Sequence, residues 1–143
     1  MPEIDMNLAS GISSFEAKEF SKAIKFLSPL AEHGNAEAQY RLAIMHQNGL
    51  GVVRNDLLAL KWMRAAAEQG NALAQHGLGF MYLQGECAAK NEVEAATWFQ
   101  RAAEQGLAGS QMTLGMLYEQ GLGVSKNEEE SKKWYALAQQ SAS

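Results

Sequence analysis

Several residue types are scarce in this chain, and each scarcity excludes a class of protein. Only one of the 143 residues, Cys87, is a cysteine, so the sequence supplies neither an internal disulfide nor a cysteine cluster for a metal. Val, Ile and Thr together number 10 against 23 alanines, so helix formers greatly outnumber strand formers. The two prolines, Pro2 and Pro29, leave most of the chain without a helix breaker. The composition therefore predicts an all-α protein.

Charge and hydropathy give no indication of a nucleic acid or a membrane as partner. The 12 Lys and Arg against 16 Asp and Glu give a net charge of −4, with no basic cluster to bind a phosphate backbone. No apolar run reaches the roughly 18 residues needed to cross a bilayer, so we expect no membrane insertion. The first residues lack the basic and apolar stretches of a signal peptide. We therefore expect a cytoplasmic protein, or a periplasmic or secreted one if a signal peptide has been removed.

The glycines recur with a period of 36 residues. Ten of the 13 lie on this lattice: Gly34, Gly70 and Gly106; Gly49, Gly85 and Gly121; Gly51 and Gly123; Gly79 and Gly115. Trp62, Trp98 and Trp134 share one repeat position, and Leu42, Leu78 and Leu114 share another. A fixed period of this length is the sequence signature of a helical repeat protein. We expect all three leucines, together with Trp62 and Trp98, to be buried.

Each repeat is expected to form two antiparallel helices. The first helix, over about 36–47, 72–83 and 108–119, has apolar residues at helical spacing and stops at a glycine loop. The second begins at an asparagine suited to capping (Asn55, Asn91 or Asn127), and the first two of these helices end at Gly70 and Gly106. Residues 3–33 match as a fourth hairpin that turns near residues 17–20. We predict a single repeat domain over 1–143, made of an N-terminal tetratricopeptide-like hairpin (3–33) and repeats 34–69, 70–105 and 106–141.

These motifs resemble the Sel-one-like repeat family, a tetratricopeptide-like α/α solenoid. The resemblance covers residues 34–141, and the residues that carry it are Leu114-Gly115-x-x-Tyr118-x-x-Gly121-x-Gly123-Val124, Trp134, and the run Ala-Ala-Glu-Gln-Gly at 66–70 and 102–106. It implies a right-handed α/α superhelix of four helical hairpins, eight helices in all. It also implies a protein-interaction scaffold, often a bacterial adaptor.

The chain departs from the family pattern at a few positions. Asn replaces Asp at the start of the second helices, Ala43 replaces a glycine, His46 a tyrosine and Ser131 an alanine. None of these changes removes a packing role. Cys87 stands where the other repeats have Gly51 and Gly123, so we expect the backbone of the second loop to differ from that of the other two.

No motif indicates catalysis, a cofactor or a metal. Gly-x-Gly at 49–51 and 121–123 follows a helix rather than a strand and lacks the Gly-Lys-Ser/Thr continuation of a phosphate loop. The histidines form no His-Glu-x-x-His motif, and Cys87 has no basic partner nearby in sequence. We therefore predict no catalytic, cofactor-binding or metal residues, and no enzyme. The alternative is an enzyme of the β-lactam-binding or hydrolase kind associated with cysteine-rich relatives, whose paired cysteines this chain lacks.

The resemblance also implies a partner-binding groove. In tetratricopeptide-like hairpins one stripe of each first helix lines the concave groove, and here that stripe is Tyr40, Ile44, Gln47, Leu73, His76, Phe80, Leu83, Met112, Met116 and Glu119. These residues are either partly covered by neighbouring helices or exposed together as an apolar binding surface, where flexible methionines would suit an adaptable groove. We expect another protein or a peptide as partner. We also expect a monomer, because polar residues on the last helix cap that end of the repeats.

Overall fold

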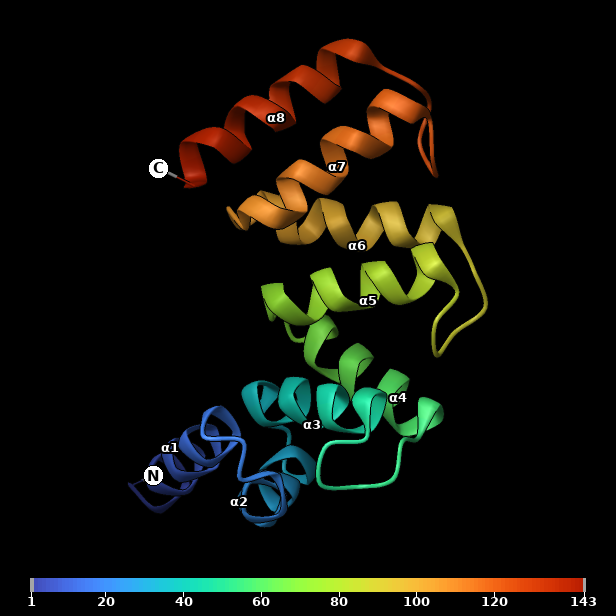
Figure 1. Cartoon of the computed structure of the whole chain (residues 1–143). Helices are drawn as coiled ribbons and strands as arrows, with labels where there is room; N and C mark the ends of the chain where they lie inside the picture. The colour runs from blue at the N-terminus through green and yellow to red at the C-terminus, as the bar shows by residue number, and fades with distance from the viewer. Residues whose placement is uncertain (1, 143) are drawn as a thin grey trace. The chain divides into compact units, whose positions relative to one another are not determined.

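The computed structural model describes residues 2–142, and within them it contains eight α-helices and no strand (Figure 1). The side chains of Pro2, Ile4 and Ala142 are not described. The chain falls into two compact units, Met1–Asn71 and Ala72–Ser143. The boundary coincides with a repeat boundary. The prediction of a single domain over 1–143 stays a prediction.

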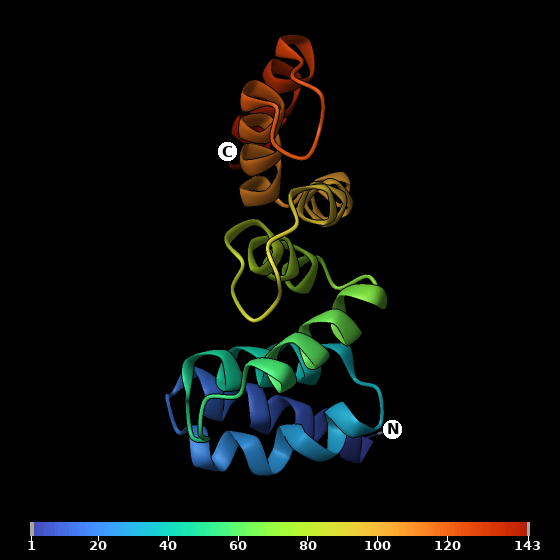
Figure 2. The ribbon, with the colours of Figure 1, turned by 90° about the vertical axis from the view of Figure 1, so that its right-hand side faces the viewer.

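Each unit consists of two helical hairpins. The first unit contains α1 (Pro2–Glu16), α2 (Phe20–Glu32), α3 (Ala36–Asn48) and α4 (Asp56–Glu68), and the second contains α5 (Ala72–Gln84), α6 (Glu92–Glu104), α7 (Ala108–Gln120) and α8 (Glu128–Ala142). Within each hairpin the two helices run antiparallel (Figure 2), and α2 packs on α3 as α6 packs on α7. The predicted ranges of the first helices and the turn after α1 are therefore confirmed.

Asparagines set where the second helices begin. The Oδ1 atom of Asn55 accepts a hydrogen bond from the backbone N–H of Leu58 at 3.0 Å, and Asn91 caps α6 in the same way at 3.1 Å. Asn127 accepts from the N–H of Glu130 at 3.1 Å. Each side chain satisfies one of the N–H groups that a helix start leaves without a partner. The predicted capping is confirmed at all three repeats.

The backbone at Cys87 matches that of its glycine counterparts, so the expectation of a different second loop was wrong. Cys87 has φ +65°, against +72° at Gly51 and +71° at Gly123. The loop imposes the left-handed conformation whatever residue stands there. At Gly123 no other residue would fit, because a Cβ would overlap the backbone oxygen of Glu92. Cys87 therefore holds a conformation that glycine adopts without strain.

The core of each unit lies between its helices. Leu42, Leu78 and Leu114 are buried as predicted, and Trp98 is also buried. Trp62 is only half-buried, contrary to expectation. It packs against the buried cluster of α2 and α3 as one of the partly buried hydrophobic residues around that cluster.

A glycine and an aromatic ring fit together in both repeats of the second unit. A Cβ on Gly79 would lie 2.9 Å from the ring of Phe99, and a Cβ on Gly115 would lie 2.8 Å from the ring of Tyr135. The aromatic side chains of α6 and α8 therefore occupy the space that these glycines leave open. In the first unit the equivalent residues are Ala43 and Met63. A flexible methionine leaves room for the alanine methyl group, which gives a physical reason for the departure at Ala43.

Candidate partner-binding faces

The ten candidate groove residues lie on α3 in the first unit and on α5 and α7 in the second. Leu73 is 46% exposed and Met112 is 51% exposed, and Glu119 is also exposed. The remaining seven, Tyr40, Ile44, Gln47, His76, Phe80, Leu83 and Met116, are half-buried. None belongs wholly to the core. Each of these side chains is therefore partly or largely presented to solvent. That they form a binding surface together stays a prediction.

The candidate residues on α5 are held by α6. The rings of His76 and Phe80 lie edge to face with centroids 4.9 Å apart, and both rings contact Phe99, at 5.4 Å and 4.9 Å respectively. Such edge-to-face packing fixes ring orientation. Burial lowers the pKa of His76 below its usual range, because the charged imidazolium loses hydration. Phe80 is therefore an anchored side chain rather than a free one.

His76 also connects α5 to α7. Its Nδ1 atom lies 2.6 Å from the hydroxyl oxygen of Ser110, a side chain with no exposed surface. Gly109 stands beside the ring, since a Cβ there would lie 3.4 Å from His76 Cε1. Sequence reasoning missed both residues. The sequence did contain a signal for Ser110, because this serine occupies the repeat position that holds Ala38 and Ala74 in the other repeats.

The faces of α3 and α7 differ in charge. On α3 the guanidinium of Arg41 lies 6.0 Å from the centre of the Tyr40 ring and donates to Glu37 at 2.7 Å. On α7 the only charged side chain is Glu119, whose Oε1 accepts a hydrogen bond from the Tyr135 hydroxyl at 3.3 Å. Burial, and then the carboxylate of Glu119, raise the pKa of Tyr135.

The first helices of the second unit are nearly free of charge. Across the 26 residues of α5 and α7, 13 in each, Glu119 is the only Asp, Glu, Lys or Arg. By contrast, α6 carries Glu92, Glu94, Arg101 and Glu104. Cores of protein interfaces are depleted of charged residues in the same way. The partly exposed face of α5 and α7 therefore carries a single charge, at the C-terminal end of α7.

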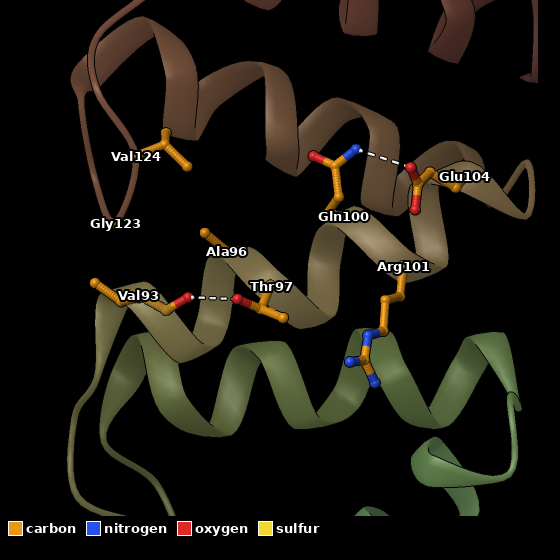
Figure 3. A pocket seen from close by; sticks show the side chains of 8 residues that line it. All are labelled: Val93, Ala96, Thr97, Gln100, Arg101, Glu104, Gly123 and Val124. Atoms are coloured by element: carbon orange, nitrogen blue, oxygen red, sulfur yellow. Dashed lines mark hydrogen bonds between the residues drawn. The ribbon is translucent and has the colours of Figure 1, made fainter.

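A separate cavity of about 350 Å³ lies on α6, against the loop between α7 and α8 (Figure 3). Its polar groups bond to one another: Thr97 Oγ1 donates to the backbone oxygen of Val93 at 3.1 Å, and Gln100 Nε2 donates to Glu104 at 3.3 Å. The guanidinium of Arg101 stacks 4.6 Å from the centre of the Trp98 ring. The two charged side chains that line this cavity, Arg101 and Glu104, are both engaged in these contacts.

Residues 2–142 hold no group of three or more His, Cys, Asp or Glu side chains placed to bind a metal ion. None of the helices in that range has both the length and the apolar character needed to span a membrane.

The stacked helical hairpins, the glycine-bounded loops and the absence of strands from residues 2–142 define an all-α helical-repeat protein of the solenoid class. The Sel1 repeat family model matches residues 36–71, 72–107 and 108–138. The chain therefore belongs to the Sel1 repeat family, as the sequence motifs indicated. Proteins of this family are typically non-catalytic scaffolds for protein interaction.

Three solved bacterial structures are similar to this chain. A Sel1 repeat protein of Oxalobacter formigenes is 38% identical, with a TM-score of 0.89 over 93% of this chain and 55% of its own. A protective antigen of uropathogenic Escherichia coli with an SLR fold is 30% identical, with a TM-score of 0.91 over 98% of this chain and 31% of its own. The chain thus spans about half and about a third of these two relatives.

The third structure, Helicobacter pylori cysteine rich protein B, is 22% identical, with a TM-score of 0.69 over 87% of this chain and 90% of its own. This similarity is evidence of a shared fold alone. A comparison with curated proteins finds no match.

Proposed function

We propose that this chain is a non-enzymatic scaffold that binds a segment of another protein on the first helices of its repeats, with the site on α5 and α7 of the second unit. One observation carries the proposal: the two first helices of the second unit have a single charged residue between them and present Leu73 and Met112 about half exposed. Solvated surfaces are normally rich in charge, so a face with exposed aliphatic side chains and one charged residue favours a protein partner. The scaffold role typical of Sel1 repeats points in the same direction.

The alternative of a β-lactam-binding or hydrolytic enzyme has no observation in its favour. The chain has one cysteine and therefore no cysteine pair. We further propose a monomer in the cytoplasm, which light scattering and cell fractionation would test.

The test separates binding from folding by choosing side chains that are exposed. A peptide enriched from a displayed random dodecapeptide library serves as the probe, and its affinity is measured by calorimetric titration. Leu73→Ala and Met112→Ala should each weaken binding by about 1–2 kcal/mol as apolar contacts are lost. Phe80→Ala should cost about 2 kcal/mol or more, but it also disrupts the packing on Phe99, so its unfolding midpoint is measured in parallel.

Two control substitutions lie away from the proposed faces. Val53→Ala removes an apolar side chain that is 89% exposed in the loop between α3 and α4. Lys61→Glu reverses an exposed charge on α4. Both should leave the affinity unchanged. If Lys61→Glu abolishes binding while Leu73→Ala and Phe80→Ala do not weaken it, the partner contacts the second helices and the proposal is wrong.

A further inference from the structure

The hydrogen bond between His76 and Ser110 determines where the neutral imidazole carries its proton. The Ser110 hydroxyl is completely buried, and its one side-chain partner in the described structure is Nδ1 of His76, 2.6 Å away. A buried hydroxyl that keeps its proton unbonded loses free energy, so the Ser110 O–H donates to Nδ1. Because Nδ1 then acts as acceptor, the proton of the neutral ring lies on Nε2.

The Nε2–H group that results is an open donor. No hydrogen bond to Nε2 is formed among the described residues, and the His76 side chain keeps part of its surface exposed to solvent. Gly109 keeps the approach clear, since a Cβ at that position would lie 3.8 Å from Nε2. Leu73 lies one turn before His76 on α5, and Met112 lies one turn after Gly109 on α7. The Nε2–H group of His76 is therefore an oriented donor close to the apolar side chains of Leu73 and Met112.

The charges around this donor indicate what it would bind. Neither α5 nor α7 carries a Lys or Arg, so a carboxylate or phosphate would find no cation on these helices to offset its desolvation. A neutral acceptor does not carry that cost. The one charge of these two helices, on Glu119 at the C-terminal end of α7, lines a hollow with Glu128 and Lys132 of α8. Two carboxylates against one ammonium leave this hollow acidic, so it would attract a cation instead.

We propose that His76 Nε2–H donates a hydrogen bond to a backbone carbonyl of an extended partner segment, whose apolar side chains contact Leu73 and Met112 and whose basic residue lies beside Glu119. This inference rests on the proposed function, because it specifies the occupant of the same face. The aromatic contacts to Phe80 and Phe99 hold the imidazole in place, so the donor is already oriented before the segment arrives.

The proton position can be tested on the free 143-residue chain. Long-range ¹H–¹⁵N NMR of the imidazole nitrogens at pH 7.5 should identify Nε2 as the protonated nitrogen of His76 and Nδ1 as the unprotonated one. Ser110→Ala removes the donor to Nδ1 and should convert the ring to a mixture of tautomers. A proton on Nδ1 in the unmodified protein would overturn the inference without any binding measurement.

The hydrogen bond to the partner requires a perturbation on each side of the interface. The probe is a synthetic copy of the library-selected peptide, compared with versions in which one backbone amide is replaced by an ester, whose carbonyl is a weaker acceptor. The double variant His76→Phe, Ser110→Ala keeps an aromatic ring and leaves no buried hydroxyl without a partner. We expect it to weaken binding of the amide peptide about 3- to 10-fold, the range for one hydrogen bond. At the position whose carbonyl contacts His76, the ester peptide should bind the unmodified protein more weakly than the amide peptide does. The double variant should bind these two peptides equally well.

Gly109→Ala supplies a matched control for folding. Its methyl group would stand over Nε2, so it should weaken peptide binding while leaving the thermal midpoint unchanged or slightly higher, since alanine is the better helix former. If, at every ester position, the loss of affinity caused by the ester simply adds to the loss caused by the double variant, the proposed contact with the carbonyl is wrong. If Leu73→Ala weakens binding but the double variant does not, the proposed function stands and this inference fails. Failure to enrich any peptide, or enrichment of acidic ones, would overturn it as well.

Discussion

Replacing Gly79 with alanine should destabilise the second unit, even though alanine favours a helix more than glycine does. The added Cβ would lie 2.9 Å from Cε2 and Cζ of Phe99, closer than carbon atoms approach one another. Phe99 has no exposed surface, and its ring is packed edge to face against His76 and Phe80. The ring therefore cannot move aside without disturbing both contacts.

Two opposing effects determine the size of the loss. Inserting a methyl group into a packed core costs about 1–3 kcal/mol, because side chains or backbone must shift. Replacing glycine by alanine inside a helix contributes about 0.5–1 kcal/mol in the other direction. We expect a net decrease of about 1–2 kcal/mol in the free energy of unfolding.

Urea unfolding followed by circular dichroism would measure the change, with Gly109→Ala as the control. A Cβ on Gly109 meets nothing closer than 3.4 Å, so this variant should be as stable as the unmodified protein or slightly more stable. A second variant combines Gly79→Ala with Phe99→Met and so copies the pair Ala43 and Met63 of the first unit. The loss for the combination should be smaller than the sum of the single losses by about 1 kcal/mol.

The reasoning would be refuted in either of two ways. Gly79→Ala could prove as stable as the unmodified protein, which would mean that the aromatic ring accommodates the methyl group freely. Alternatively, the two substitutions could be additive, which would mean that residues 79 and 99 do not compete for the same space.

Three further predictions concern single side chains. Trp98→Ala should cost about 3–5 kcal/mol of unfolding free energy, and Trp134→Ala should cost less. The two tryptophans are almost equally buried, but Trp98 Nε1 donates a hydrogen bond to Glu94 at 3.2 Å, whereas Trp134 Nε1 is enclosed without a partner. Equal losses in urea unfolding would contradict the predicted difference. Cys87→Gly should increase the free energy of unfolding by about 1 kcal/mol and so raise the thermal midpoint, because glycine adopts φ +65° without strain. An unchanged midpoint would show that the loop stores no strain. Finally, burial lowers the pKa of His76 in the folded state, so the contribution of His76 to stability is complete above pH 6.5 and falls as the pH drops toward the lowered pKa. His76→Gln should therefore reduce the loss of stability that occurs between pH 7.5 and pH 5. An identical loss in this variant would exclude His76 as the source.

The sequence by itself determined the helices, their limits and the family. The positions that define them act locally: Asn55 and Asn91 cap the N–H groups of the next turn, and the lattice glycines close helices with a left-handed residue. Such interactions involve residues a few positions apart, so the 36-residue period was sufficient to predict the helix boundaries closely. The all-α repeat class followed from the same pattern.

The tertiary structure decided which side chains meet across helices. It left Trp62 half-buried, placed Phe80 against Phe99, and brought His76 within 2.6 Å of Ser110, 34 residues along the chain. Periodicity places a residue on one face of its helix, but the exposure of that face depends on how closely neighbouring helices approach, and the size of single side chains sets that approach. Small residues at 79 and 109 let the ring of Phe99 and the imidazole of His76 fit against their helices. The repeat pattern gives the glycine at 79, but it does not say which side chain fills the space beside either glycine.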